Sequence, residues 1–220
     1  MFITKSVRKA GVLFLDELPE YRRDVLEALR QPMEDGFVTI TRVSAQSTYP
    51  SSFMLICSMN PCPCGNYGSR TQQCHCSQAE IRRYLNRVSG PLLDRIDLHI
   101  EIESVPPDRI ADKSLAESSD AVRERVEKAR AIQRERYAKL KIPCNARLDA
   151  RSITEFCHMK PDAQKMLMKA CETMKLSNRA FTRILKVART IADLEASDDI
   201  AINHVAEAVQ YRMLDSKYWG

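Results

Sequence analysis

Two adjacent carboxylates follow an apolar run near the start of the chain. In GVLFLDELPE, residues 11–20, Asp16 and Glu17 come directly after Val12–Leu15. An apolar run without alternation is typical of a parallel strand that is buried on both faces. Open α/β sheets bind ligands beyond the carboxyl ends of such strands, so the two acids indicate a functional site. The alternative is that they only open the loop and helix that follow.

Four cysteines form a second group that could do chemistry. Cys62, Cys64, Cys74 and Cys76 follow the pattern CxC-x9-CxC in a loop that contains glycine and proline. Four thiolates are the ligands of a structural Zn²⁺, and a loop without a core of its own gains stability from such an ion. The alternatives are reduced thiols and an iron–sulfur cluster. His75 is expected to be a spectator.

The composition describes an ordinary globular protein of 220 residues with a formal net charge of +5. No apolar run is long enough to cross a membrane, and MFITKSVRKA at the start lacks the apolar core of a signal peptide. We therefore expect a cytoplasmic protein with no membrane partner, whose eight cysteines are not a disulfide framework. The modest positive charge is compatible with a nucleic-acid partner but does not require one.

The carboxylates and the four cysteines lie in a half of the chain that alternates strand and helix patterns. Besides the first strand, the patterns predict a helix over residues 22–33, a half-exposed hairpin strand at FVTITRV, and strands at FMLICSMN and RIDLHIEI. Ser77 and Glu80 have the spacing of a capping box at the start of another helix. These elements predict an α/β domain over residues 1–104, with a cysteine-rich loop over residues 61–77.

The second half has almost no strand pattern. A polar, proline-bearing linker and a highly charged helix are expected over residues 105–145, with the helix running from about Asp120 to Leu140. A helical domain is expected over residues 146–220. Its predicted helices cover residues 151–157, 161–174, 178–194 and 202–214. The predicted fold class is therefore α/β plus all-α.

Five sequence blocks resemble one protein family. They are GVLFLDELPE, LRQPMEDGFVTITR, SMNPCPCG, RYLNRVSGPLLDRIDLHIEI and LSNRAFTRILKVARTIADL, and they cover nearly the whole chain from Gly11. The family is that of the magnesium-chelatase-like AAA+ ATPases of the ComM/YifB type. The resemblance implies an AAA+ parallel-sheet core followed by a helical lid domain, in an ATPase whose subunits form a ring. Members of the ComM type are DNA helicases that drive branch migration during natural transformation.

The resemblance implies roles for three residues around the carboxylates. GVLFLDE is similar to a Walker B strand, in which Asp16 would help to hold Mg²⁺ and Glu17 would polarise the attacking water. Asn60, which ends FMLICSMN, resembles the sensor-1 residue that orients the same water. From its own neighbours alone, Asn60 before Pro61 could equally be an ordinary turn residue.

Three arginines complete the implied site. Arg95 in LLDRID resembles the arginine finger that one subunit inserts into its neighbour's ATP site, and we expect it to be exposed without a partner in its own chain. Arg179 in LSNR resembles the sensor-2 arginine of the lid, with Arg183 one turn further along as second choice. Alternatively, Arg95 pairs with Asp94 or Asp97. The other two arginines could belong to the solvated face of an amphipathic helix.

The chain lacks one motif that the family requires. A P-loop has the pattern G-x-x-x-x-G-K-[ST], and none of the six glycines precedes a lysine. The family's P-loop lies upstream of the Walker B strand, so we expect this sequence to be the C-terminal part of such an ATPase, with a truncated AAA+ parallel-sheet core. ATP and Mg²⁺ would bind only together with the missing N-terminal part, and we expect no ATP hydrolysis by the chain alone.

The expected partners follow from the same resemblance. They are other AAA+ subunits in a homo-oligomeric ring, expected to be a hexamer, and DNA for the full-length protein. Arg42 at the end of the hairpin strand, and Arg82, Arg83 and Arg87 after the cysteine loop, could contact phosphates. Two alternatives stay open. The chain could belong to a chelatase-type AAA+ subunit with a non-DNA substrate, or it could be a nucleotide-free, zinc-bearing module that binds partner subunits.

Overall fold

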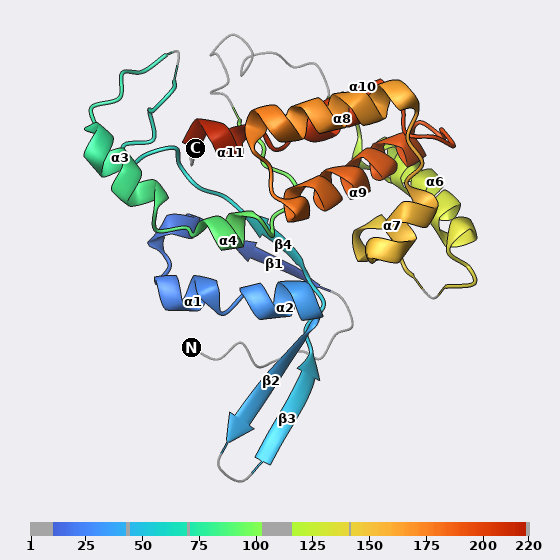
Figure 1. The fold of residues 1–220 in the computed structure, drawn as a ribbon. Coiled ribbons are helices and arrows are strands. Elements are labelled where there is room, and N and C mark those ends of the chain that lie inside the picture. Colours follow the sequence, from blue (N-terminus) through green and yellow to red (C-terminus); the bar gives the residue numbers. More distant parts are fainter. Residues whose placement is uncertain (1–10, 43–44, 70, 103–115, 141, 219–220) are drawn as a thin grey trace. The chain divides into compact units, whose positions relative to one another are not determined.

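The computed structural model describes residues 11–42, 45–69, 71–102, 116–140 and 142–218 (Figure 1). They divide into two units, the first ending at Ile96 and the second beginning at Asp97. The first unit is mixed α/β. Its elements are β1 (Val12–Leu15), the 3₁₀ turn η1 (Leu18–Glu20), α1 (Arg23–Glu27), α2 (Arg30–Asp35), β2 (Phe37–Arg42), β3 (Ala45–Pro50), β4 (Met54–Cys57), α3 (Gln78–Leu85) and α4 (Gly90–Leu93).

β1 and β4 form a short parallel sheet, with Val12 opposite Met54 and Leu15 opposite Cys57. One face of this sheet packs on a buried cluster, while on the other face Val12 and Phe14 are 65% and 59% exposed. The expectation that β1 is covered on both faces is therefore wrong for the described residues, because they place a packing layer on one face only. The buried cluster consists of Leu18, Leu26, Leu29, Val88, Leu92 and Leu93.

β2 and β3 form the antiparallel hairpin that the alternation in FVTITRV predicted. The hydroxyls of Thr39 and Thr48 are 3.1 Å apart on neighbouring strands. The hairpin extends away from the β1–β4 sheet of the same unit (Figure 1), and every residue of β3 is exposed. Both strands therefore offer side chains to the solvent.

The predicted helix over residues 22–33 is two short helices, α1 and α2, which meet at Ala28 and Leu29. Pro32 explains the break, because proline has no N–H to donate to the carbonyl of Ala28 and its ring would collide with that carbonyl. Gly36 ends α2 in the left-handed region with a φ of 71°, and its N–H donates to the carbonyl of Pro32.

The predicted strand at RIDLHIEI is not formed. Residues 95–102 are all described, and none of them belongs to a strand. A strand needs a hydrogen-bonded neighbour, and here the N–H of His99 donates at 2.9 Å to the carbonyl of Tyr211, which lies outside any strand. Leu98, Ile100 and Ile102 keep an alternating apolar pattern but are exposed. The apolar alternation in this segment does not show whether a neighbouring strand is available to pair with it.

The second unit is helical. Two of its predicted helices, over residues 161–174 and 178–194, have the bounds of α8 and α9. α8, α9 and α10 pack together around one core (Figure 1). Its elements are α6 (Ser119–Arg136), the 3₁₀ turn η2 (Asn145–Arg147), α7 (Ala150–Phe156), α8 (Pro161–Met174), α9 (Asn178–Leu194), α10 (Ile202–Gln210) and α11 (Met213–Tyr218), whose last residue groups with the first unit.

A buried ionic network joins α6 to α9 inside the helical unit. Asp193, whose side chain has no exposed surface, accepts hydrogen bonds from Arg136 at 2.6 and 3.0 Å and from Arg189 at 3.1 Å. The Asn145 amide also donates to Asp193 at 2.8 Å, and the Tyr137 hydroxyl donates to Asn145 at 2.6 Å. Because buried charges are tolerated only when they are paired, this network fixes the relative position of the two helices.

The described residues thus confirm a mixed α/β unit with a short parallel sheet and a separate helical unit. The predicted domain boundary at residue 104 and the predicted linker over residues 105–115 lie outside the described residues. None of the described helices combines the length and the hydropathy that a membrane span needs.

Candidate functional site

Asp16 and Glu17 form a tight turn directly after β1. Glu17 has a φ of 51°, in the left-handed region that residues other than glycine rarely adopt. Its N–H lies 3.1 Å from Asp16 Oδ1 and 3.3 Å from Ser58 Oγ, and the Ser58 hydroxyl also donates to Asp16. The N–H of Leu18 donates to the Ser58 carbonyl at 2.9 Å. Strained backbone that its surroundings hold in place is typical of functional sites.

Glu17 and Asn60 line one depression in the first unit, just beyond the carboxyl ends of β1 and β4. The structure therefore brings two of the residues predicted to be catalytic to one site, and Asp16 precedes Glu17 in the same turn. Arg87 donates to Glu20 at 2.9 Å and to the carbonyl of Pro19 at 3.3 Å, so its positive charge is paired with the η1 turn. The other lining residues are Glu20, Pro63, Glu80, Arg83, Tyr84 and Arg87.

Ser58 is a residue of this site that the sequence interpretation missed. It fastens the turn from the neighbouring strand, since its N–H donates to the Leu15 carbonyl at 3.0 Å and its hydroxyl donates to Asp16. A signal was available. Neighbouring parallel strands end at the same edge of a sheet, so a hydroxyl directly after β4 is expected near the acids that directly follow β1.

Arg95 also lies in the first unit but is not among the residues that line this depression. It is 7% exposed, forms an ion pair with Glu34 of α2 at 2.8 Å, and donates to the Pro91 carbonyl. The expectation that Arg95 is exposed with no partner in its own chain is therefore wrong. Its partner, Glu34, belongs to a helix that is distant in the sequence. The alternative prediction, a pair with Asp94 or Asp97, did not anticipate this partner.

Arg179 and Arg183 lie near the start of α9 in the second unit. Arg179 is exposed, whereas Arg183 forms an ion pair with Asp97. Lys186 on the same helix donates to the Ala146 carbonyl at 3.1 Å, and burial lowers its pKa. This face of the helix is thus partly fixed by partners within its own unit, and Arg179 is the more accessible of the two predicted sensor-2 candidates.

The four predicted cysteine ligands converge. The Sγ atom of Cys62 lies 3.4 Å from that of Cys64 and 3.7 Å from that of Cys74, and Cys64 and Cys74 are 3.6 Å apart. Including Cys76, the sulfur atoms all lie within 4.8 Å of one another. A tetrahedral Zn²⁺ with bonds of about 2.3 Å requires sulfur atoms about 3.8 Å apart. The donor set therefore fits a tetrahedral metal ion after small adjustments.

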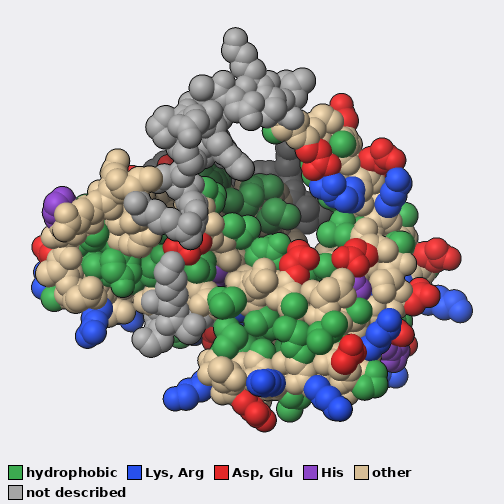
Figure 2. Space-filling view, turned by 90° about the horizontal axis from the view of Figure 1, so that it is seen from above, with side chains coloured by type: hydrophobic (Ala, Val, Ile, Leu, Met, Phe, Trp, Pro, Cys, Tyr) green, Lys and Arg blue, Asp and Glu red, His purple; other side chains and the backbone are tan. Residues whose placement is uncertain are grey.

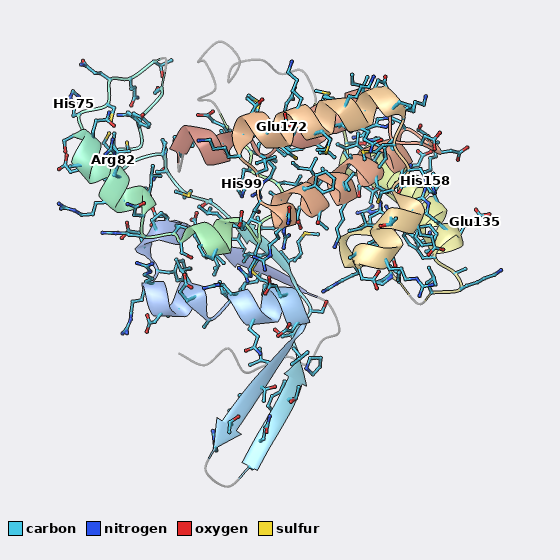
Figure 3. The ribbon with its side chains drawn as sticks, in the orientation of Figure 1. His75, Arg82, His99, Glu135, His158 and Glu172 are labelled. Carbon is cyan, nitrogen blue, oxygen red and sulfur yellow. The ribbon has the colours of Figure 1, made fainter. Side chains whose placement is uncertain are left out.

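Backbone N–H groups of the loop hold Cys62 in place. The N–H of Tyr67 donates to Cys62 Sγ at 3.3 Å, and the N–H of Gly65 donates to the Cys62 carbonyl at 3.0 Å. Gly65 has a φ of 81°, which lets the chain turn back over the sulfur atoms. His75 lies on the same loop, ahead of Arg82 on α3 (Figure 3), but is exposed and does not belong to the convergent set.

The thiols of the set differ in how readily they ionise. The backbone N–H groups of Asn66 and His75 lower the pKa of Cys64 to about 6. The Cys64 N–H acts in the same direction on Cys76, but burial and the neighbouring thiols outweigh it and raise the pKa of Cys76 to about 12. A divalent cation would remove this repulsion by neutralising the shared negative charge. The chemistry of the donor set, like its geometry, suits a metal ion.

The arginines considered for phosphate contact occupy two places in the first unit. Arg42 is exposed at the end of β2, and Arg82 and Arg83 are exposed on α3, where Figure 3 labels Arg82. Arg87 is paired with Glu20. On the face seen in Figure 2, the Lys and Arg side chains of the described residues are interspersed with Asp and Glu side chains, so the positive charge is not gathered there.

Comparison with known proteins identifies the class to which this fold and site belong. Residues 4–110 match the family model of magnesium chelatase, subunit ChlI, and residues 116–212 match the model of the ChlI C-terminal region. The chain belongs to the magnesium-chelatase-like family, of the ComM/YifB type.

Its relatives include the uncharacterized protein YifB of Salmonella typhimurium, 46% identical over 211 residues, and the competence protein ComM of Haemophilus influenzae, 45% identical over 210 residues. The matches cover 96% and 95% of this chain but 40% of each relative. The chain thus spans about two fifths of the length of these relatives.

Proposed function

We propose that the chain provides the Walker B, sensor and lid portion of an AAA+ ATPase. The observation that carries the proposal is the turn after β1, where Asp16 and Glu17 are held by Ser58 and Glu17 shares a depression with Asn60. Family membership supports the same assignment. A phosphate-binding loop, which has no match within these 220 residues, would complete the site.

Asp16, Glu17 and Asn60 each have a role in this reaction. Asp16 would hold Mg²⁺ through the ion's water shell, Glu17 would accept a proton from the water that attacks the γ-phosphate, and Asn60 would orient that water. ATP with Mg²⁺ supplies the phosphoryl group and the neutralising charge when it is bound. Arg179, or Arg183 as second choice, would contact the nucleotide from the lid. For Arg183 this requires release of Asp97.

Glu17→Gln tests the reaction in a longer protein that also carries a P-loop. Turnover of ATP should fall by about 10²-fold to 10⁴-fold while ATP binding persists, because the amide keeps the shape but cannot accept the proton. Glu20→Gln is the matched control, since Glu20 lines the same depression but is paired with Arg87. Equal losses in both variants would reject Glu17 as the base. The present chain alone should not hydrolyse ATP.

We further propose a homo-oligomeric ring, expected to be a hexamer, that acts on DNA. The exposed β2–β3 hairpin with Arg42 at its end supports a nucleic-acid contact, as does the resemblance to the branch-migration helicases of the ComM type. Arg95 would serve as the finger in this ring only if it exchanged Glu34 for the neighbour's phosphate.

Binding of branched DNA at increasing salt tests the proposed substrate. Affinity should fall steeply with salt, since each phosphate contact releases counterions, and Arg42→Ala should weaken binding and reduce the slope. Arg22→Ala, which removes an exposed arginine elsewhere in the same unit, is the control. Absence of DNA binding by an active ATPase would favour a chelatase-type subunit with another substrate.

The cysteine set is proposed to hold one structural Zn²⁺. The sulfur atoms within 4.8 Å of one another carry this proposal. Protein prepared without chelators should contain roughly one zinc per chain, and Cys62→Ser should abolish it. Cys144→Ser, a cysteine outside the set, should leave the zinc content unchanged. Zinc-free protein with four reactive thiols at the loop would favour reduced thiols instead.

A further inference from the structure

α3 connects the cysteine set with the carboxylate site inside the first unit. Three of its side chains, Ile81, Tyr84 and Leu85, are buried in one cluster with Cys62, and Cys74 and Cys76 pack against that cluster. Tyr84 also lines the depression that contains Glu17 and Asn60. A single aromatic side chain thus contacts the packing around the thiols and borders the proposed catalytic site.

α3 is held at both ends, so Tyr84 has little freedom to move independently. At the start of the helix, the Ser77 and Glu80 capping box is complete, with the Ser77 N–H donating to Glu80 at 2.8 Å. Just after the end of the helix, Arg87 donates to Glu20 and to the Pro19 carbonyl of η1. The helix therefore ties the cysteine loop to the turn that follows β1.

Asn60 is tied to the cysteine loop by the chain itself and by a close approach. It lies two residues before Cys62, and a Cβ atom added at Gly65 would lie 3.9 Å from Asn60 Oδ1. Gly65 is in turn held by its hydrogen bond to the Cys62 carbonyl. A change in the Cys62–Gly65 turn is thus expected to reach the Asn60 side chain directly.

Tyr84 is a second neighbour of this region, because Tyr84 and Asn60 line the same depression. Burial raises the pKa of the Tyr84 phenol, and the Asn60 backbone offsets part of that rise, in keeping with this shared lining. Both the Gly65 turn and Tyr84 belong to the structure that surrounds the four sulfur atoms.

We infer that Tyr84 is a positioning residue, through which metal occupancy of the four cysteines sets the location of Asn60 at the proposed catalytic site. The inference deepens the proposed function and rests on it, because the position of Asn60 matters for catalysis only if Asn60 orients the attacking water. Metal release would loosen the Cys62–Gly65 turn and the packing under α3. The Gly65 turn and Tyr84 would then both shift beside Asn60, without any change in Glu17.

NMR of the whole chain with ¹⁵N-labelled asparagine measures this coupling. Removing Zn²⁺ should shift the backbone and side-chain signals of Asn60 and raise the hydrogen-exchange rate of its backbone amide by about tenfold or more. Asn145 and Asn203, in the second unit, are internal references whose signals should not move. Returning Zn²⁺ should restore the Asn60 signals. Unchanged Asn60 signals on metal removal, or a chain that binds no Zn²⁺ at these cysteines, would overturn the inference.

Tyr84→Phe separates positioning from packing. Phenylalanine keeps the buried ring but removes the hydroxyl, so the zinc content should stay the same while the Asn60 amide exchanges faster. Tyr67→Phe is the matched control, because Tyr67 packs against the same cluster but does not line the depression. An Asn60 signal that is insensitive to Tyr84→Phe, or equally sensitive to Tyr67→Phe, would also overturn the inference.

These experiments measure the environment of Asn60 and not ATP turnover. A failure of the positioning inference can therefore be told apart from a failure of the proposed reaction. Asn60 signals that respond to Zn²⁺ and to Tyr84→Phe would support the positioning even if the longer, P-loop-bearing protein hydrolysed no ATP. In that case the reaction would be rejected.

Discussion

The two units of the chain differ in how completely they bury their apolar surface. In the helical unit, α8, α9 and α10 enclose a core, and a buried ionic network joins α6 to α9. In the α/β unit, the sheet of β1 and β4 packs on one face, while Val12 and Phe14 stay exposed on the other. The proposed catalytic turn and the cysteine set both belong to the more open unit.

The difference follows from how each kind of element obtains its partners. A helix satisfies its own backbone and needs packing along one stripe, and α8, α9 and α10 follow one another in the sequence. A parallel strand needs neighbours at its edges and layers on its faces, and β1 meets β4 only after two helices and a hairpin. A substitution at an internal contact of the helical unit should therefore lower the free energy of unfolding more than a substitution on the open sheet face of the α/β unit.

The largest expected effect is in the network of the helical unit. Asp193→Asn keeps the shape of the side chain but removes the negative charge that Arg136 and Arg189 share. Leaving two guanidinium groups without their carboxylate should lower the free energy of unfolding of this unit by about 3 kcal/mol or more. Urea unfolding followed by helical circular dichroism measures the change.

Asp120→Asn is the control for this prediction. Asp120 and Arg123 form an ion pair at 2.6 Å, the same distance as the Arg136–Asp193 pair, but their side chains are 89% and 69% exposed. An exposed pair at this spacing contributes about 0.5 kcal/mol or less. Similar losses of free energy of unfolding in Asp193→Asn and Asp120→Asn would mean that the buried network contributes no more than an exposed ion pair.

The helices of the second unit could be predicted from the sequence because their signals are local. Pro161 at the first position and the Ser177 cap mark the starts of α8 and α9, and both helices have the predicted bounds. The capping box at Ser77 was also visible. In contrast, the open face of β1 and the missing strand at residues 95–102 depend on which elements pack or pair with them, and a single apolar run contains no such information.

The candidate site divides in the same way. The cysteine set was found from spacing, because four ligands on one short loop can converge without distant elements. Glu17 and Asn60 were paired from the family resemblance. Ser58 was missed and Arg95 was wrongly expected to be exposed, since each is defined by a partner far away in the sequence, Asp16 for the first and Glu34 for the second.

Arg95→Ala tests whether the α/β unit also depends on a buried pair. The loss of free energy of unfolding should be about 1–3 kcal/mol, below the range for a fully buried pair, because Glu34 keeps 36% of its side chain exposed and can be hydrated. Arg22→Ala is matched to it, since Arg22 and Asp24 are also 2.8 Å apart but both are exposed. If both variants lost about 0.5 kcal/mol or less of the free energy of unfolding, the pair of Arg95 with Glu34 would be weak. Arg95 could then leave Glu34 readily and act as an arginine finger.

Ser77→Ala should have a smaller effect, of about 1 kcal/mol, because it removes the N-cap of α3. The cap also predicts a pH dependence. The Ser77 backbone N–H, and then its hydroxyl, lower the pKa of Glu80 below its ordinary value. This contribution is therefore present above the unfolded pKa of Glu80 and is lost as the pH falls through the folded one.

Unfolding of the wild type and of Glu80→Gln at a series of acidic pH values measures the Glu80 contribution. The difference between the two proteins should shrink as the pH falls. Ser177 caps a helix of the other unit without a reciprocal carboxylate. The difference in free energy of unfolding between the wild type and Ser177→Ala should therefore not shrink as the pH falls. If the difference between the wild type and Glu80→Gln stayed constant down to low pH, the Glu80 carboxylate would not contribute to the cap.

The smallest expected effect is at the open face itself. Phe14→Thr replaces a ring that is 59% exposed with a residue that favours strands, so the free energy of unfolding should change by about 0.5 kcal/mol or less. Leu13→Thr, one residue earlier and pointing into the buried cluster, should cost about 2 kcal/mol or more. The contrast is informative because the two positions share a strand and the partner strand β4, and differ in which face they occupy. Unfolding measured at several protein concentrations separates two reasons for a departure. If Phe14→Thr costs as much as Leu13→Thr and the loss grows with concentration, copies of the chain cover this face in solution. If the loss is large at every concentration, the face is buried within the chain, and the α/β unit is as closed as the helical one.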